Sequence, residues 1–368
     1  MAMEMLITRI RTGLLFLLLA FIPAGPVAGQ SAQQSPSNSA PDSASSPIHV
    51  ARFSRWLDFQ TGNLGARYKR AKSSNGPWFY QLQYQFMARG RIKFDREGHY
   101  YAGLRLSTGD IFPYGWNSTG AGTGDPSAKI YLKDLFFSAT PRKLFEIQFG
   151  GIGINRGEST EIATYSNNGY MMGERISVRR PDKLFFDEIS ATGAYLNDAE
   201  KPGVAGRFRR LGEMNYHQFL VSKKIHKRAS VSADYTFQDG IETLRQAIKL
   251  YPKENRFFDS VVFEDYQRLD FHPAWGFALS MQKNPTRRLA LTWGFVDIDR
   301  HYVNWNSDRL GKGKRVFLFA SYNFWREFSA GVFAGKAFCN SFPVGNAARF
   351  DFIVSYDFLK ALKRADIL

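Results

Sequence analysis

Apolar and polar residues alternate along much of the chain, with the two-residue period of a β-strand. In the clearest segment, aromatic and aliphatic side chains occupy the even positions from Trp78 to Phe94, with the exception of Gly90. The odd positions of that segment carry the amides and cations Gln81, Gln83, Gln85, Arg89, Arg91 and Lys93. Weaker versions of the same pattern recur to the last strand, at 348–358. The alternation predicts strands with one apolar and one polar face.

Turn-forming residues divide the alternating region into about sixteen segments. The predicted strands are 52–71, 78–94, 99–108, 129–139, 144–154, 173–180, 184–196, 213–223, 230–238, 241–251, 257–268, 274–283, 288–297, 314–324, 327–338 and 348–358. Alternation is poor in 129–139, 213–223 and 257–268, so fourteen or eighteen strands would also fit.

The links between these strands are alternately short and mostly longer, and the longer ones are rich in Gly, Asn and Asp. Outer-membrane barrels have short periplasmic turns and longer external loops, and an even strand number. We therefore predict an all-β fold: a transmembrane antiparallel β-barrel of about 16 strands, with both termini periplasmic. A soluble β-sandwich or soluble barrel would also alternate. Aromatic residues, at 15% of the chain, concentrate on the apolar faces, and this favours the membrane barrel.

The first 29 residues have the layout of a cleaved secretory signal. Arg9 and Arg11 precede a ten-residue apolar run, Gly13–Ile22, which is too short to span a bilayer as a helix. Small residues end this segment at Gly29. Residues 30–48 are rich in Ser, Gln and Pro and predict a disordered leader. The expected organisation is a signal peptide (1–29), this leader (30–48), an outer-membrane barrel (49–358) and a short C-terminal tail (359–368).

A barrel of sixteen strands leaves an aqueous channel, so a pore is the simplest function. The formal net charge is +16, and removing residues 1–29, with their two arginines and Glu4, leaves +15. Arg105 and Arg288 share polar faces in the same way as Arg89, Arg91 and Lys93. Rings of Arg and Lys favour anions in pores. Other basic residues belong to turns or to the outer surface, where lipopolysaccharide is anionic, and nucleic-acid binding does not suit an exported chain.

One long loop, Asn155–Met172, is large enough to fold inward and narrow the pore. Asn155, Arg156, Glu158 and Glu161 would then line a constriction. An ordinary exposed surface loop is the alternative, and we favour it because loops generally lie on the surface.

Two other classes of function compete with a pore. An outer-membrane enzyme needs a nucleophile with a base, or a carboxylate pair, and the six histidines are scattered without such a motif. No Cys/His cluster has the spacing of metal ligands, and the single cysteine is Cys339. A structural or adhesive barrel usually needs fewer strands or an added domain. We expect no catalytic residues, metal or cofactor.

The block Gly151–Asp198 contains three short motifs, Asn155-Arg156-Gly157-Glu158, Gly173-Glu174-Arg175 and Phe186-Asp187-Glu188. Through them the chain resembles alginate-export and phosphate-selective porin-like barrels, within a general likeness to bacterial outer-membrane porins. The resemblance implies a charge-lined channel for anionic solutes or acidic saccharides. Such barrels usually end on an aromatic residue that the barrel-insertion machinery reads, whereas ten residues follow Phe358 here. A monomer and a homo-oligomer both remain open.

Overall fold

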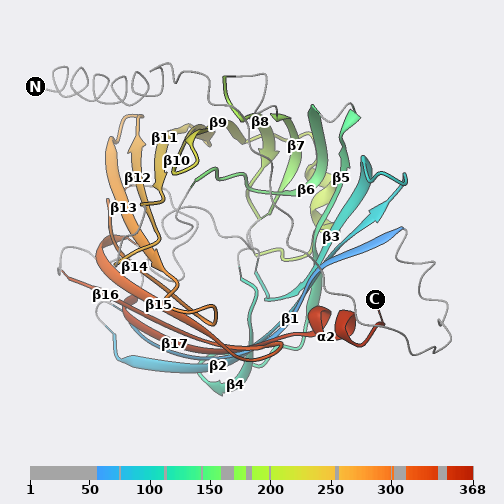
Figure 1. Ribbon diagram of the computed structural model, residues 1–368. Coiled ribbons are helices and arrows are strands. Elements are labelled where there is room, and N and C mark those ends of the chain that lie inside the picture. The colour runs from blue at the N-terminus through green and yellow to red at the C-terminus, as the bar shows by residue number, and fades with distance from the viewer. Residues whose placement is uncertain are drawn as a thin grey trace, which may run out of the picture. The chain divides into compact units, whose positions relative to one another are not determined.

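The chain folds as one antiparallel sheet that closes on itself, as the computed structural model shows (Figure 1). The structure describes residues 56–73, 76–111, 114–141, 144–158, 170–179, 185–198, 200–252, 257–299, 301, 312–338 and 346–367. Closure is made by β17 pairing with β1, from Asn63↔Asp357 to Ser73↔Asn346. The predicted signal peptide and leader lie outside the described residues.

Seventeen strands and two short helical segments make up the described part of the chain. In order they are β1 (Leu57–Ser73), β2 (Trp78–Lys93), β3 (Tyr100–Thr108), β4 (Asn117–Gly122), β5 (Ile130–Ala139), β6 (Phe145–Gly153), β7 (Tyr170–Arg179), β8 (Glu188–Tyr195), η3 (Ala205–Arg210), β9 (Tyr216–His226), β10 (Ala229–Gln238), β11 (Ile241–Leu250), β12 (Ser260–Arg268), β13 (Ala274–Lys283), β14 (Leu289–Ile298), β15 (Gly313–Trp325), β16 (Phe328–Ala337), β17 (Asn346–Asp357) and α2 (Phe358–Arg364). Sixteen of the strands form the barrel wall, which confirms the predicted all-β closed barrel. No described helix is both long and apolar enough to cross a bilayer.

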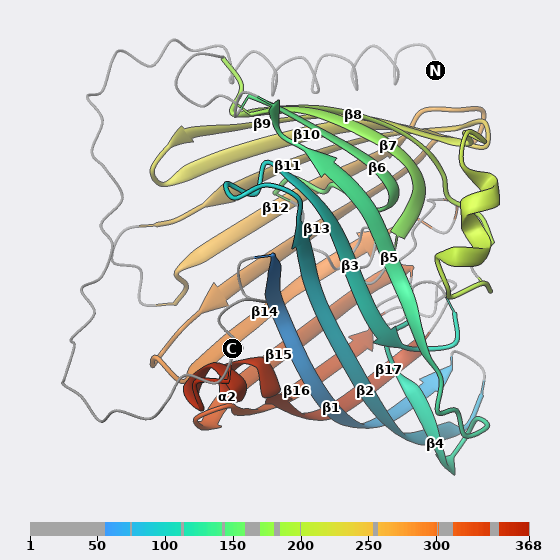
Figure 2. The same cartoon turned by 90° about the vertical axis from the view of Figure 1, so that its right-hand side faces the viewer.

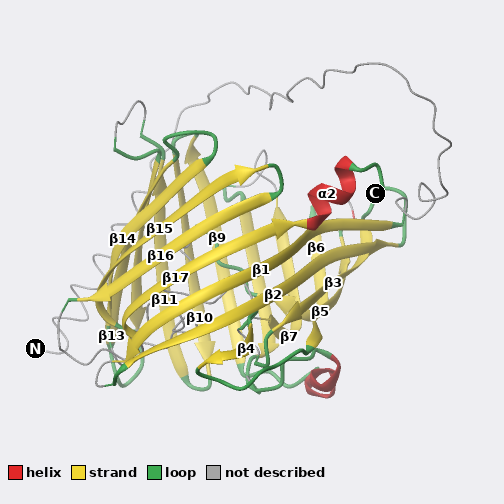
Figure 3. Cartoon of the chain, turned by 90° about the horizontal axis from the view of Figure 1, so that it is seen from below, coloured by secondary structure: helices red, strands yellow, loops and turns green. Residues whose placement is uncertain are grey.

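The two faces of the wall differ as the alternation predicted. On β17, Phe350 and Phe352 are 40% and 43% exposed, whereas the alternate residues Arg349 and Asp351 are almost fully buried. The exposed aromatic residues point outward, and the charged ones point into the barrel. Because the strand number is even, β1 begins and β17 ends at the same end of the barrel, where α2 lies (Figure 3).

The additional strand β4 lies within the region predicted as a loop, Gly109–Ala128. It pairs with β2 at Gln81, Gln83 and Tyr84, beyond Met87, where the pairing of β2 with β3 ends (Figure 2). The sequence of β4, NSTGAG, has little intrinsic preference for a strand. Strand β4 therefore forms because the edge of the longer strand β2 offers it backbone hydrogen-bond partners, and not because of its own sequence.

A β-bulge explains the weak alternation of 129–139. Arg105 pairs with Asp134, but the next residue, Leu106, pairs with Leu132, so Lys133 is an extra residue on β5. A bulge shifts the alternation between faces at that point. Lys133 and Asp134 are consequently both buried, at 0% and 6% exposed.

The inner face is less polar than predicted along β12 to β16. Tyr266, Val296, Phe317 and Phe333 belong to one buried apolar cluster there. Small residues make room for these side chains: a Cβ placed at Gly294 would lie 2.8 Å from the ring of Phe317. The alternation assigns this glycine to the polar face, whereas in the structure it accommodates a ring from the adjacent strand.

The C-terminal tail forms a short helix that packs against the outer wall at the joint between β17 and β1. The strand ends at Asp357, whose side chain accepts a hydrogen bond from the Lys360 amide and so begins α2. The Phe358 ring lies parallel to Phe86 of β2, with ring centroids 5.8 Å apart. At the other end of the helix, Arg364 forms an ion pair of 2.6 Å with Glu327, in the turn between β15 and β16. The tail thus spans the joint from the β15–β16 turn to β2.

We expect this packing to require glycine at position 62. A Cβ there would lie 2.5 Å from the Phe358 ring, so Gly62→Ala should displace the ring and lower the free energy of unfolding. Loss of an aromatic pair costs about 0.5–1.5 kcal/mol. Urea unfolding of the protein in detergent or lipid measures this change in the free energy of unfolding. In a Phe358→Ala background the Gly62→Ala penalty should disappear, as a double-mutant cycle tests. Gly206→Ala, where a Cβ meets nothing within 4 Å, is the control. Equal penalties in both backgrounds would contradict this account.

Candidate functional site

The inner face of β1 and β2 carries a ladder of amides and cations. Gln81, Gln83, Gln85, Arg89, Arg91 and Lys93 follow one another at alternate positions on β2, on the side opposite the exposed outer residues. Arg67 of β1, which is 2% exposed, donates from Nε to Gln83 Oε1 at 2.8 Å. Gln83 in turn donates to Gln81 Oε1 at 2.8 Å. The polar positions of the two long strands therefore form one hydrogen-bonded surface.

Two arginines lie directly opposite each other where β2 meets β3. Arg89 and Arg105 are register partners, so their guanidinium groups share the same part of the inner wall. Arg105 pairs with Asp134 Oδ1 at 3.0 Å and is 1% exposed. Arg89 lies 4.0 Å from Oδ2 of the same carboxylate, and its side chain is 43% exposed. Like charges directly opposite each other destabilise a sheet. Here the Asp134 carboxylate offsets this repulsion, because it forms ion pairs with both arginines.

Arg91 follows Arg89 on the same face. Its guanidinium carbon lies 4.6 Å from the centroid of the Tyr101 ring, in a cation–π contact. With the Gln60 amide oxygen turned toward it, Nη2 donates to that oxygen at 2.9 Å. No described carboxylate forms an ion pair with Arg91, so its charge is solvated by an amide and a ring rather than neutralised.

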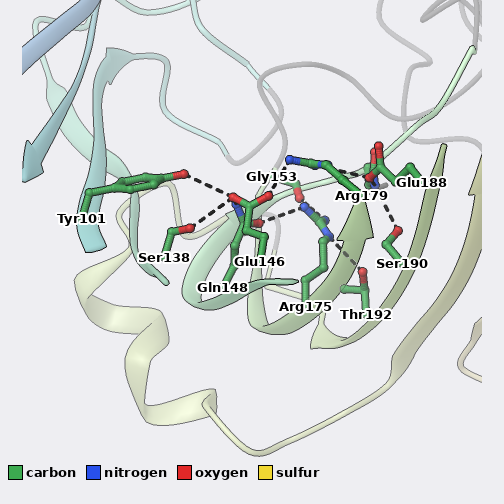
Figure 4. A network of polar contacts seen from close by, with 11 residues as sticks. Tyr101, Ser138, Glu146, Gln148, Gly153, Arg175, Arg179, Glu188, Ser190 and Thr192 are labelled. Atoms are coloured by element: carbon green, nitrogen blue, oxygen red, sulfur yellow. Dashed lines mark hydrogen bonds and ion pairs between the residues drawn. The ribbon is translucent and has the colours of Figure 1, made fainter. Parts of the chain in front are cut away.

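The next part of the wall holds a network built around Glu146 of β6 (Figure 4). Oε1 of Glu146 accepts from Tyr101, Ser138 and Gln148, at 3.3, 3.1 and 2.9 Å. Arg179 of β7 lies between Glu146 and Glu188, with ion pairs of 2.5 and 3.3 Å.

Arg175, on the same inner face of β7, is held in place by neutral oxygens (Figure 4). Its guanidinium donates to Thr192 at 3.0 Å, to Gln148 at 3.2 Å and to the Gly153 carbonyl at 2.5 Å. Five strands, β3, β5, β6, β7 and β8, thus contribute side chains to one hydrogen-bonded polar cluster.

The described start of the loop after β6 lies against the inner wall. Asn155 donates to Glu188 Oε1 and Ser190 Oγ at 2.9 and 3.1 Å, and its carbonyl accepts from Gln218 at 2.8 Å. The Glu158 amide donates to Ser232 Oγ at 2.9 Å, and its carboxylate lies 3.8 Å from Lys249 Nζ. Residues 155–158 therefore follow the inside of β8 to β11, and the favoured expectation of an exposed loop is wrong for this part. Glu161 lies outside the described residues.

A pocket of about 300 Å³ lies where this loop meets β1 to β7. Its charged lining comprises Arg89, Arg91, Arg175 and Arg179, with Asp134 and Glu146. Four arginines against two carboxylates leave a formal charge of +2. Gln60, Tyr101, Phe136, Gln148 and Asn155 complete most of the remaining lining.

The structure brings some of the sequence-predicted residues together and leaves others apart. Arg89 and Arg91 line the pocket, and Arg105 is buried beside it. Lys93 lies on the same inner face, next to the turn at Gly98. Arg288 precedes β14, is exposed and does not join the cluster. Arg156 lies between the anchored residues Asn155 and Glu158.

Sequence reasoning missed the acidic partners and half of the arginines in the pocket. The bulge in β5 interrupts the alternation next to Asp134, so the sequence could not assign this residue to the inner face. Arg175 and Arg179 are four residues apart on β7 and therefore face the same side of the sheet. This even spacing is the signal from which both could have been predicted to face the lumen. Among the described residues, no group of three or more His, Cys, Asp or Glu side chains could hold a metal ion.

The closed sixteen-stranded antiparallel wall is the fold seen in porins. No protein-family model matches the sequence, and no curated protein does. Among solved structures, the chain is similar to Salmonella typhi OmpF, determined in complex with daunomycin, at 12% identity and a TM-score of 0.52. That match covers 82% of this chain and 97% of the other. It is also similar to two mutants of Rh. blastica porin, each at 11% identity and a TM-score of 0.51, covering 82% of this chain and 100% of the porin. At this identity the likeness shows the fold alone.

We expect Asp134 to be the carboxylate that keeps the basic wall folded. Asp134→Asn removes the counter-charge that faces buried Arg105, which should lower the free energy of unfolding by about 3–5 kcal/mol. Adding Arg105→Gln should recover part of this loss, because the buried cation is then removed as well. Urea unfolding measures both, and Asp125→Asn, at an exposed loop position, is the control. A loss no larger than that of the control would exclude this role.

Proposed function

We propose that the chain forms a water-filled pore in the bacterial outer membrane, through which small hydrophilic solutes pass and anions are favoured, acidic saccharides among them. The sixteen-stranded wall supports the pore, because barrels of sixteen to eighteen strands leave an aqueous channel. The outward-facing apolar residues support residence in a bilayer, and the pairing of β17 with β1 leaves no open sheet edge facing lipid.

The observation that carries the anion preference is the unequal pairing of charges at the pocket. Asp134 is shared by Arg89 and Arg105, and Arg91 has no described carboxylate partner. A cation that lacks a neutralising partner raises the local concentration of mobile anions. The solute path beside β2 would therefore carry excess positive charge at this pocket, whose lining includes Gly153, Ile154 and Asn155.

The remaining parts of the proposal concern how the chain reaches its membrane. We propose export by the signal 1–29, followed by assembly by the barrel-insertion machinery among outer-membrane lipid and lipopolysaccharide. Both ends of the barrel chain would then face the periplasm. A pore needs no catalytic residue and no cofactor, and it could work as one chain or as a homo-oligomer.

We expect anion selectivity to depend on Arg89 and Arg91. The Arg89→Gln/Arg91→Gln variant should shift the reversal potential in a KCl gradient toward the cation side. Fixed charges are screened beyond about 8 Å at physiological salt and about 3 Å at 1 M. The difference between variant and wild type should therefore be largest in dilute salt and fade toward 1 M.

The matched control is Arg70→Gln. Arg70 carries the same charge on the neighbouring strand but faces outward, with its guanidinium carbon 4.9 Å from the Trp78 ring. This change should leave the reversal potential unaltered. An unshifted potential in the double variant would remove these two residues from selectivity, and a wild-type preference for cations would overturn the proposed anion pore.

Processing and location give a separate prediction. N-terminal sequencing of the purified protein should find a mature end near Gln30, because the signal is expected to be cleaved after Gly29. Fractionation should recover the protein with the outer membrane. Recovery as a soluble periplasmic protein would exclude the membrane pore.

A further inference from the structure

Trp116 lies inside the barrel on the β1 side, in a region where the sequence predicted only an external loop. Trp116 precedes β4, in the segment that links β3 to β5. A Cβ placed at Gly65 would lie 3.1 Å from Cη2 of the indole and 3.5 Å from Cζ3. Gly65 shares the inward side of β1 with Arg67, whose guanidinium carbon is 4.4 Å from the ring centroid. The indole therefore lies on the inner wall.

The residues on both sides of Trp116 are fixed by hydrogen bonds. Thr108 Oγ1 donates to the Gly115 carbonyl at 2.7 Å, and the Gly109 amide donates to Asn117 Oδ1 at 2.7 Å. Asn117, which is fully buried, donates to the Lys129 carbonyl and to the Tyr84 hydroxyl, at 2.9 and 3.2 Å.

Lys133, the extra residue of the β5 bulge, also forms hydrogen bonds to the residues before Trp116. Its ammonium group donates to the carbonyl oxygens of Ile111 and Tyr114. Gly109 adopts a φ of +102°, and a Cβ there would clash with the Tyr114 carbonyl. These contacts fix the described residues on both sides of the indole, and its position follows from them.

The surroundings of the indole define the chemistry it offers. Arg67 covers part of one ring face and Gly65 meets the ring edge, yet the side chain keeps partial exposure. Next to it on β2, the Gln85 amide makes no hydrogen bond to any described residue. An amide offers both donors and acceptors, and an indole offers a flat apolar face. Together they suit a ring with apolar C–H faces and a rim of hydroxyl groups.

We propose that Trp116 is a second selectivity element of the lumen, which retards cyclic, hydroxyl-bearing solutes relative to open-chain solutes of the same charge. Trp116 lies beside Gln85, and the basic pocket lies beside Arg89. These two residues are four positions, about 13 Å, apart along β2, so the indole is separate from the pocket. The inference rests on the pore function proposed above. It adds a preference for solute shape to the preference for charge.

The test compares glucuronate, a cyclic monoanion, with gluconate, its open-chain counterpart of nearly equal mass. Each is titrated against the KCl current of single channels in a planar bilayer. In the wild type, glucuronate should reduce the current at a concentration about two- to tenfold lower than gluconate, the range that aromatic packing provides. In Trp116→Ala this ratio should approach one, and Trp116→Phe should restore much of it.

The matched control is Trp78→Ala, which removes a tryptophan from the outer face of β2, where it is 47% exposed. This control should retain the wild-type ratio, and heat-dependent electrophoretic mobility establishes that each variant is folded. Channels that conduct and prefer anions but show equal ratios in wild type and Trp116→Ala would overturn this inference alone. A folded wild type that does not conduct would overturn the pore itself.

Discussion

The whole molecule depends on the closure of its wall, which is made by the joint between β17 and β1. In a bilayer an open sheet edge is not viable, because no water is present to satisfy its N–H and C=O groups. The joint runs along β1 from Asn63 to Ser73, and β2 continues the same long surface on the other side. Where β3 stops short on β2, β4 takes over the pairing. The tail then crosses the joint on the outside, with Phe358 over Gly62 and Arg364 on Glu327.

Closure forces charged side chains into the interior, and the way they are paired sets what the lumen can do. Arg245 lies with Asp234 and Glu264, and Arg349 with Asp351, as buried ion pairs. Breaking such a pair leaves a buried charge without compensation, whereas the intact pair contributes little to the field felt by a solute. The formal charge of +16 on the chain therefore does not make the interior of the barrel uniformly basic. At the pocket, four arginines face two carboxylates, and Arg91 and Arg175 are held by neutral groups. The apolar sector around Phe317 and Phe333 lies on other strands.

The sequence predicted the strands well, because a two-residue period over a closed wall is a strong constraint. The inward side of β2 could be read directly, from Gln81 to Lys93, and the limits of most strands agree with the structure to within a few residues. The bulge at Lys133 could not be read, since one extra residue exchanges the two faces. Asp134 and its pairing with Arg105 were lost with it. Contacts between distant segments, such as Asn155 with Gln218 or Trp116 with Arg67, leave no periodic trace.

The same physical cause links the two parts of the lumen that the sequence concealed. A strand of the wall can present only alternate side chains inward, so β2 alone gives a ladder of fixed spacing and little shape. Shape has to come from chain that leaves the wall and returns to it. The segment before β4 does so with Trp116, and the loop after β6 does so with Asn155–Glu158. Each is anchored by hydrogen bonds, from Asn117 to the Tyr84 hydroxyl and the Lys129 carbonyl in one case, and from Asn155 to Glu188 and Ser190 of β8 in the other. These hydrogen bonds fix the inserted groups relative to the wall, and the shape of the lumen at these two places follows from them.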